Sequence, residues 1–396
     1  MKSKAPSAGG NVRDLCGLCG AAVALLATAC SDGMELTAVE TQVATEQSAV
    51  VETYEATPLD TLGGDSQASL INARGEVFGV SATSEGVDHA VGWKNGKVFD
   101  LGVLGDAGNA SEAVAVNDRG QVVGYSGPRY EAGHAFLWES GVMRDLGTLG
   151  GDASFAAAIN NRGEVVGSAT DSAGIPRAVL WKDRVALDLG TLGGRASGAS
   201  AINDRGQVVG SSDTAAADHV HAFIWEHGVM TQLDELDEVS AINLRGEVLG
   251  WIDSGDSALW RQGSSTEFGS GAFASALGNR GGVVGEALNA AGKRTAFSFK
   301  NGTLLDLGWL GSESCRYCSS ASALNERGQI VGSALTASNE VHAFVWDHGT
   351  MTDLGEPGKT SWALAINERG DIVGVQRPNP TGSWQGVLWT RRCHSR

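Results

Sequence analysis

The chain has 396 residues, of which 56 are glycine, 42% are hydrophobic and 19% are charged. A disordered chain would contain fewer apolar residues and more charge, and a coiled coil would be poor in glycine. The formal net charge of −17 repels nucleic-acid phosphates and anionic membrane surfaces, so we expect no nucleic-acid partner. Composition and charge therefore indicate a folded, turn-rich protein.

Residues 1–29 have the features of an export signal. Basic residues precede the apolar run LCGLCGAAVALLATA at 15–29, which is too short to cross a bilayer. The run ends in ATAC at 27–30, which resembles a bacterial lipobox, although an alanine replaces its usual leucine. Ordinary cleavage after the A-x-A sequence is the alternative. We predict lipidation of Cys30 and a location at the bacterial outer membrane or cell surface, with the periplasm or secretion as the alternative.

An acidic segment separates this signal from the rest of the chain. Residues 30–56 are rich in threonine, valine and glutamate and contain no turn signals. Such a composition is typical of a solvated linker. We therefore expect residues 30–56 to carry the lipid on their first residue and to form a flexible tether.

One nine-residue motif, Ile-Asn-x-Arg-Gly-x-Val-Val-Gly, recurs eight times after the tether. Its arginines are Arg74, Arg119, Arg162, Arg205, Arg245, Arg280, Arg327 and Arg369. Their spacing of 35 to 47 residues brackets the period of about 40–45 that is typical of four-stranded propeller blades.

Each repeat contains the signals of four short strands. A run of small residues ends in Ile-Asn and precedes a tight x-Arg-Gly turn, in which glycine supplies a positive φ. Val-Val-Gly then begins a second strand, HAFLW at 134–138 is an example of the third, and the fourth ends in Asp-Leu-Gly, as at 145–147. We place the first copy of Asp-Leu-Gly at Asp60, and the copies at Leu233 and Phe268 are degenerate.

The order of these segments predicts a closed ring. The chain enters on a lone fourth-strand segment at Asp60 and ends, at Trp389, after a third strand that lacks a fourth. We therefore predict an all-β fold, a β-propeller of eight four-stranded blades over residues 57–391, in which the N-terminal strand completes the last blade. Seven blades are the alternative, because the fifth and sixth repeats are degenerate. Residues 392–396 would form a tail.

The repeat resembles the HAF-type extracellular repeat of bacterial secreted proteins, which is named after His-Ala-Phe. This tripeptide stands at 134–136, 221–223 and 342–344, and the resemblance covers the chain after residue 56. The resemblance implies an exported protein. It implies no enzyme activity, because the family is defined by its repeat rather than by a reaction.

Residues that recur in every repeat are expected to hold the fold together. We expect the eight turn arginines to pair with nearby carboxylates or carbonyls, or to stack on tryptophan, rather than to form a ring that binds anions. Four repeats carry a histidine at one shared position: His89, His134, His221 and His342. These four repeats cannot bring their histidines together on one ion, so we predict no metal site and no cofactor.

The cysteines after the tether predict one short disulfide. Cys315 and Cys318 form Cys-Arg-Tyr-Cys in an insertion between the sixth and seventh repeats. In a cytosolic protein this spacing would suggest redox catalysis, but in an exported β-protein it favours a disulfide. Cys393 is left over near the C-terminus, and the sequence leaves its state open.

Aromatic residues outside the repeat pattern are the best candidates for ligand contact. Trp309 and Trp362 lie in or beside the connections that flank the seventh repeat, and Trp384 ends a loop of the eighth. Because these loops share one face of a propeller, we predict a ligand patch of Trp309, Tyr317, Trp362 and Trp384, whose rings would stack on a sugar or a partner protein. The alternative is that the rings fill gaps left by local insertions.

The sequence favours a non-catalytic interaction protein. No nucleophile elbow, paired-carboxylate motif, HExxH or phosphate loop stands in its required context. We predict an exported, monomeric scaffold, held at the membrane by its lipid alone, that binds a protein or a polysaccharide at the cell surface. One alternative is a secreted glycan hydrolase or lyase. Arg129 and Tyr130, in a loop of the second repeat, are the residues that would favour it. Another is a structural component of the cell envelope.

Overall fold

The computed structural model describes residues 51–106, 108–128, 133–216, 220–311, 315–378 and 381–394. In these ranges the chain forms 32 strands, arranged as eight four-stranded antiparallel sheets. No segment in the described ranges forms a helix long and apolar enough to cross a membrane. The chain divides into two units. One of them, Tyr54–Thr390, contains the ring of sheets, and the other, Met1–Thr53 with Arg391–Arg396, lies mostly outside the described residues.

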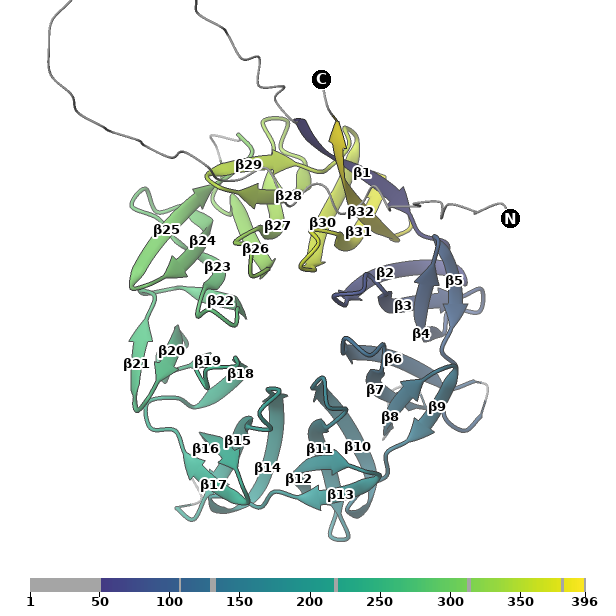
Figure 1. Ribbon diagram of the computed structural model, residues 1–396, viewed down its shortest axis with the longest axis vertical. Coiled ribbons are helices and arrows are strands. Elements are labelled where there is room, and N and C mark those ends of the chain that lie inside the picture. Colours follow the sequence, from purple (N-terminus) through teal and green to yellow (C-terminus); the bar gives the residue numbers. More distant parts are fainter. Residues whose placement is uncertain are drawn as a thin grey trace, which may run out of the picture. The chain divides into compact units, whose positions relative to one another are not determined.

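The eight sheets are the blades of a propeller and surround a common axis (Figure 1). The predicted eight blades are confirmed, and the alternative of seven is wrong. In each blade we name the strands A to D, from the innermost to the outermost. Because neighbouring strands are antiparallel, the A–B and C–D turns lie on one face of the ring, here the turn face. The B–C loops and D–A connections lie on the opposite face, here the loop face.

The first four blades follow one another along the chain. Blade 1 contains β2 (Gly63–Ile71), β3 (Val77–Thr83), β4 (Asp88–Lys94) and β5 (Lys97–Asp100). Blade 2 contains β6 (Ala110–Val116), β7 (Val122–Gly127), β8 (His134–Glu139) and β9 (Val142–Asp145). Blade 3 contains β10 (Gly150–Ile159), β11 (Val165–Asp171), β12 (Pro176–Lys182) and β13 (Val185–Asp188). Blade 4 contains β14 (Gly193–Ile202), β15 (Val208–Thr214), β16 (Val220–Glu226) and β17 (Val229–Gln232).

The last four blades continue the ring, and blade 8 takes its outer strand from the N-terminal side of the chain. Blade 5 contains β18 (Glu238–Ile242), β19 (Val248–Trp251), β20 (Ser257–Arg261) and β21 (Ser264–Glu267). Blade 6 contains β22 (Phe273–Leu277), β23 (Val283–Leu288), β24 (Arg294–Lys300) and β25 (Thr303–Gly308). Blade 7 contains β26 (Ser319–Leu324), β27 (Ile330–Leu335), β28 (Val341–Asp347) and β29 (Thr350–Asp353). Blade 8 contains β30 (Lys359–Ile366), β31 (Ile372–Pro378), β32 (Gln385–His394) and β1 (Val51–Pro58).

The alanine of His-Ala-Phe links neighbouring blades. The backbone amide of Ala135, in strand C of blade 2, donates to the hydroxyl of Ser154, in strand A of blade 3, over 3.0 Å. The same bond joins four further pairs: Ala90 to Ser111, Ala178 to Ser197, Ala296 to Ser319 and Ala343 to Ser361. Ala135 is fully buried, so a larger side chain would have to displace well-packed neighbours.

The N-terminal strand closes the ring, as the sequence predicted. β1 lies beside β32 in blade 8 (Figure 1). Next to this pair, the amide of Leu59 donates to the carbonyl of Gly386 over 2.9 Å. The amide of Gly386 in turn donates to the hydroxyl of Ser66, also over 2.9 Å. This last bond repeats the blade-to-blade link described above, so the seam between blades 8 and 1 is built like the five other interfaces that contain this link.

The bounds of the two closing strands differ from the expected ones. β1 begins at Val51, so residues 51–56, which the sequence placed in the tether, belong to a strand. Tyr54 and Ala56 pack against the hydrophobic cluster between blades 7 and 8. β32 extends to His394, so the predicted tail of residues 392–396 begins within a strand.

Asp60 does not end a strand D, contrary to the expectation. In blade 1, the leucine of Asp-Leu-Gly is Leu101, and its backbone amide donates to a carbonyl of strand C. The amide of Leu59 makes the same bond in blade 8, so Leu59 takes the place of the leucine in the repeat. The aspartate position before it is therefore taken by Pro58, at the end of β1. The carboxylate of Asp60 instead forms an ion pair with the ammonium group of Lys97, at 2.7 Å.

Buried asparagines of the repeat motif form a belt around the axis on the turn face. Asn117 donates through Nδ2 to the carbonyl of Asn160 in the next blade and to the side chain of Gln121, while its Oδ1 accepts the amides of Arg119 and Gln121. The other members of the belt are Asn72, Asn160, Asn203, Asn243, Asn325 and Asn367.

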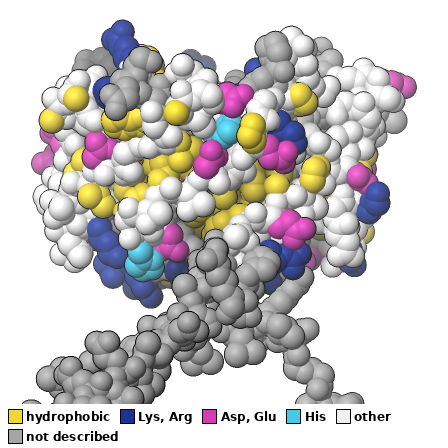
Figure 2. Space-filling model, turned by 90° about the horizontal axis from the view of Figure 1, so that it is seen from above, with side chains coloured by type: hydrophobic (Ala, Val, Ile, Leu, Met, Phe, Trp, Pro, Cys, Tyr) yellow, Lys and Arg dark blue, Asp and Glu magenta, His cyan; other side chains and the backbone are white. Residues whose placement is uncertain are grey.

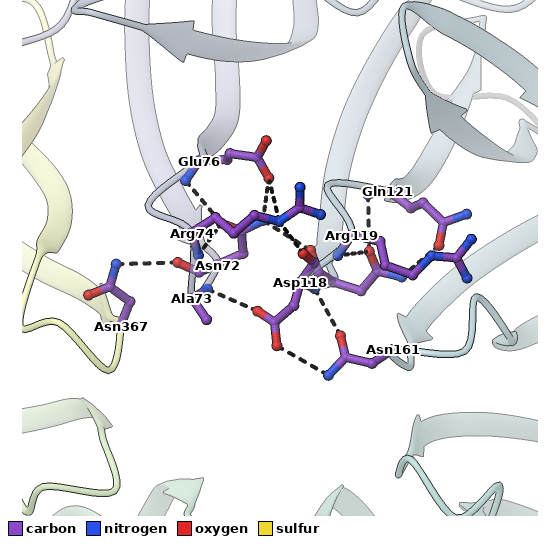
Figure 3. A network of polar contacts seen from close by, with 10 residues as sticks. Asn72, Ala73, Arg74, Glu76, Asp118, Arg119, Gln121, Asn161 and Asn367 are labelled. Carbon is purple, nitrogen blue, oxygen red and sulfur yellow. Dashed lines mark hydrogen bonds and ion pairs between the residues drawn. The ribbon is translucent and has the colours of Figure 1, made fainter. Parts of the chain in front are cut away.

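The asparagine belt crosses the seam of the ring and is interrupted once in the described chain. Asn367 of blade 8 donates to the carbonyl of Asn72 of blade 1 over 3.2 Å (Figure 3). In blade 6, Gly278 stands at the asparagine position and accepts from Asn243, but has no side chain to donate onward.

Several of the repeated arginines bond to nearby carbonyls or carboxylates, as expected, and three of the four histidines pair with a carboxylate. Arg119 donates to the carbonyl of Arg162 in the next blade over 3.1 Å, and the arginine of blade 5 makes the same bond, whereas that of blade 6 donates to the carbonyl of Glu326. His134 of strand C lies 2.7 Å from the carboxylate of Asp145 in strand D. The equivalent residues of blades 1 and 7 form the same pair.

Hydrophobic clusters fill the spaces between the blades. Leu354 of blade 7, for example, packs with Val387 and Trp389 of blade 8, and the indole of Trp389 donates to the carbonyl of Leu354 over 3.0 Å. Seen from the side, hydrophobic side chains show between charged and polar ones on the outer edge of the ring (Figure 2). The core is therefore a series of layers between blades rather than one centre.

Replacing Asn117 by alanine should lower the free energy of unfolding by about 2–4 kcal/mol, because a buried side chain loses four hydrogen bonds. The control Val114→Ala, an exposed change on β6, should alter it by about 0.5 kcal/mol or less. Chemical denaturation measures both values. Equal stability of N117A and the unchanged protein would contradict the structural role of the belt.

Candidate functional site

One position of strand A varies from blade to blade, although its neighbours repeat. In blade 2 it is Glu112, between the linking Ser111 and the buried Ala113. From blade 1 to blade 8 the residues are Gln67, Glu112, Phe155, Gly198, Glu238, Phe273, Ser320 and Trp362. Each lies directly opposite a residue of strand B, in the same order Val80, Tyr125, Ser168, Ser211, Trp251, Glu286, Ser333 and Val375. Because repeated residues build the scaffold, these variable pairs are the places where a functional site can differ from the scaffold.

A groove opens beside blade 7, where both variable residues are serines. Ser320 and Ser333 face each other across strands A and B, whereas blade 8 carries Trp362 at the strand A position. The groove has a volume of about 210 Å³, and its walls include Tyr317, Trp362 and, from blade 6, Glu286. We name it the blade-7 groove. It lies toward the loop face, where β26 begins and β27 ends.

One wall of the blade-7 groove is a stack of two tryptophans. The rings of Trp362 and Trp384 lie 4.6 Å apart between centroids, at 26°. Trp384 is held by blade 1, because its carbonyl accepts the amide of Ser66 over 2.9 Å and its amide donates to the carboxylate of Asp65 over 3.2 Å. The guanidinium of Arg377 covers the Trp384 ring at 4.3 Å from the centroid. The stack is therefore rigid and depends on the closing seam.

The opposite rim of the groove is the Cys-Arg-Tyr-Cys loop. The structure joins Cys315 and Cys318 by a disulfide, with 5.2 Å between their Cα atoms. Cys318 donates its amide to the carbonyl of Arg294 in blade 6 and accepts the amide of Leu335 in blade 7, both over 2.8 Å. Tyr317 is thereby fixed beside the groove with 65% of its surface exposed.

The carboxylate of Glu286 supplies the negative charge of the groove wall. It lies 3.4 Å from the guanidinium of Arg294, which also donates to the carbonyl of Gly271 over 2.8 Å. The same guanidinium covers the ring of Phe273, 4.9 Å from its centroid. Glu286 is half-buried and paired, so it is oriented to accept hydrogen bonds from a neutral group in the groove.

The structure brings together three of the four residues predicted to form a ligand patch. Tyr317 and Trp362 line the groove, and Trp384 supports Trp362 from behind. Trp309 packs instead against the cluster between blades 6 and 7, and Lys293 lies over its ring at 4.6 Å from the centroid. It is not among the groove residues.

Sequence reasoning missed the polar part of the groove. Glu286, Ser320 and Ser333 belong to three different strands, and nothing in the repeat motif distinguishes them. The available signal was the position between the linking serine and the buried alanine, which varies while its neighbours repeat. Other predicted residues, namely Cys30, Arg129, Tyr130 and the side chain of Cys393, lie outside the described part of the chain.

A pair of carboxyls lies at the loop face of blade 5. Burial, followed by the charge of Asp253, raises the pKa of Asp237 above its ordinary value, while His221 of blade 4 lowers it. The backbone amide of Asp237 donates to the backbone carbonyl of Trp251 over 2.9 Å. Among the described residues, no group of three or more His, Cys, Asp or Glu side chains is placed to hold a metal ion.

The variable pair of blade 2 joins a tyrosine to a carboxylate. Tyr125 donates its hydroxyl to Glu112, and its ring packs edge-on against Phe155 of blade 3, with 5.6 Å between centroids. The hydrogen bond to Glu112, with smaller effects of burial and of negative charge, raises the pKa of Tyr125 to about 12.

Glu112→Gln should return the pKa of Tyr125 toward the ordinary value of about 10, because the phenol then loses its charged acceptor. The pair stabilises the folded state below about pH 10, and this contribution declines as the pH rises toward 12. Ultraviolet titration of the phenols measures the shift, with Tyr125→Phe identifying the signal. A pKa that stays at about 12 in E112Q would contradict the assignment.

Replacing Cys315 and Cys318 together by serine should free Tyr317 without unfolding the ring. Disulfides typically add about 2–4 kcal/mol to the free energy of unfolding, and less when the closed loop is short. Because this disulfide closes a loop of very few residues, its loss should lower the free energy of unfolding by no more than the lower end of that range. Hydrogen exchange should accelerate at residues 315–318 and stay slow in β27 and β30. A global rise in exchange would show that the disulfide holds the fold rather than the groove rim.

Comparison with known proteins relates the chain to other structures by architecture alone. No protein-family model and no curated protein sequence matches it. A puromycin-hydrolysing peptidase of Mycobacterium tuberculosis has 11% identity and a TM-score of 0.43, covering 82% of this chain, which spans only 62% of the peptidase. The β-propeller domain of the Trilobed protease from Pyrococcus furiosus has 9% identity and a TM-score of 0.41, covering 83% and 97%. The SapL1 lectin in complex with α-methyl fucoside has 11% identity and a TM-score of 0.32, covering 84% and 97%.

Proposed function

We propose that this protein is an exported, non-catalytic β-propeller that binds a glycan in the blade-7 groove. The observation that carries the proposal is the tryptophan pair, Trp362 on Trp384, at the wall of a small hollow. A sugar ring has an apolar C–H face and a polar hydroxyl edge. In the groove, the aromatic wall can stack on the C–H face. The hydroxyls of Ser320 and Ser333 and the carboxylate of Glu286 can form hydrogen bonds with the hydroxyl edge.

The size of the groove supports a glycan over an extended peptide. Its volume of about 210 Å³ is smaller than the about 300–1,000 Å³ of sites that enclose a drug-sized ligand. One sugar ring fits such a space, while the rest of a polysaccharide chain would continue over the loop face. The fixed geometry of Trp362 and Tyr317 also reduces the entropy lost on binding.

The export and anchoring of the propeller remain part of this proposal. The signal-like residues 1–29, the lipobox-like sequence that ends at Cys30 and the HAF-type repeats support a lipoprotein at the cell surface. A lipid on Cys30 would tie the propeller to the membrane, so the groove would act on glycans of the envelope or its surroundings. Electrospray mass spectrometry of the protein from membranes tests this, because acylation adds the mass of the lipid at Cys30.

A secreted glycan hydrolase is the second candidate function, and one observation favours it. Asp237 and Asp253 form a carboxyl pair in which the pKa of Asp237 is raised. A raised carboxyl pKa is one feature of a general acid. This candidate places the ligand at blade 5 rather than at blade 7.

Replacing Trp362 and Trp384 together by alanine should weaken binding of any glycan recognised by the unchanged protein by about 30-fold or more, because the stacking wall disappears. A glycan array followed by calorimetry identifies the ligand and measures the affinity. The control Trp251→Ala, at the variable pair of blade 5, should keep the affinity. Unchanged binding by a folded Trp362/Trp384 variant would contradict the proposal. Glycan cleavage that disappears in Asp237→Asn would favour the hydrolase.

A further inference from the structure

Cations lie over aromatic rings in one sector of the ring. The four cation–aromatic contacts in the described part of the chain all belong to blades 6 to 8 and the loop between blades 6 and 7: Lys293 on Trp309, Arg294 on Phe273, Arg316 on Tyr317 and Arg377 on Trp384. This is the sector of the blade-7 groove. The protein as a whole has 46 acidic residues against 29 lysines and arginines, so such a local gathering of positive charge runs against its overall charge.

Two of these arginines lack an anionic partner among the residues that the structure describes. Neither Arg316 nor Arg377 forms an ion pair with any described residue, whereas Arg294 is paired with Glu286 and Arg177 of blade 3 with Asp188. The Nε of Arg377 is buried and lacks a hydrogen-bond partner. Buried donors are nearly always satisfied in folded proteins, so this N–H departs from the usual pattern.

The two guanidiniums lie over aromatic rings on different sides of the blade-7 groove. Arg316 lies over Tyr317 at 5.9 Å, at one rim of the groove. At the other wall, Trp362 stacks on Trp384, and Arg377 covers the far side of Trp384. A chain of sugars that fills the groove and continues over both rims would therefore meet a guanidinium on either side.

We propose that the glycan bound by this protein is acidic, with carboxylates on its sugar rings, as in a polyuronate. This inference rests on the proposed function, that the blade-7 groove binds a glycan. Guanidinium groups bind carboxylates through two parallel N–H···O bonds, and a guanidinium stacked on an indole is already oriented for this. Tyr317 and Trp362 hold the ring in the groove, while Arg316 and Arg377 bind the carboxylates of the neighbouring rings.

The test compares acidic oligosaccharides with their own neutral forms. Calorimetry on the full mature protein uses oligomers of galacturonate, mannuronate and glucuronate, each beside its methyl ester, which keeps the sugar and removes the charge. At least one acidic oligomer should bind about tenfold or more tightly than its ester. The variant Arg316→Ala/Arg377→Ala should lose this preference and bind both forms alike. The control Arg144→Ala, an exposed arginine of β9, should keep it.

The outcomes separate this inference from the proposed function. Binding of esters or other neutral glycans that equals that of the acids, and that still requires Trp362, overturns the acidic ligand and leaves the glycan site in place. No binding of any acidic or neutral glycan overturns both. Binding of poly-glutamate in place of the polyuronates, lost in the same variants, overturns the glycan in favour of an acidic peptide. Because Arg377 is half-buried, Arg316→Ala alone, at an exposed position, should still lower the preference if the double variant is unstable.

Discussion

The structure depends on the hydrogen bonds that close the ring between β32 and the first residues of the propeller. The seam contains the same backbone-to-serine link as five other blade interfaces, from Gly386 to Ser66, and the asparagine belt continues across it from Asn367 to Asn72. Without closure, strand edges would be exposed at both ends of the array. Closure also has a local consequence, because Trp384 is held by Asp65 and Ser66 and in turn supports Trp362.

The repeated residues hold the blades together. A functional site is therefore expected among the residues that depart from the repeat. Serine, alanine, asparagine and arginine of the repeat form links between neighbouring blades. The belt is interrupted at Gly278 in blade 6, and the longest spacing between motif arginines, 47 residues, follows directly. The inserted Cys-Arg-Tyr-Cys loop lies there and bonds blade 6 to blade 7 through Cys318. The same insertion that departs from the repeat thus both joins two blades and builds the rim of the groove.

The repeat made the fold predictable, because one motif per blade gives both the number of blades and their order. The place of closure was also predictable, since the last repeat lacks a fourth strand. The residues of the closing strand were harder to predict. β1 ends in Pro58, where the equivalent strands lead into Asp-Leu-Gly, and its sequence VETYEATP has the composition of a linker. Only its contacts, through Tyr54 and Ala56, reveal the strand.

The site was predictable in part for a different reason. Trp362 and Trp384 stand out in the sequence as aromatic residues outside the repeat, and their loops share a face. The serines of the groove do not stand out, because their effect depends on the larger residues of neighbouring blades. Trp309 is closer than Trp362 to Tyr317 along the chain, but packs into the cluster between blades 6 and 7 instead of the groove. Such choices depend on packing across blades, which a repeat alignment does not contain.

The central claim is that the closed ring presents one ligand site, the blade-7 groove. A crystal structure of the mature protein grown with an acidic oligosaccharide tests it most directly. We predict a sugar ring against the face of Trp362, above Ser320 and Ser333, with a carboxylate of a neighbouring ring at Arg316 or Arg377. An oligosaccharide bound only at another blade, or on the turn face, would contradict the account.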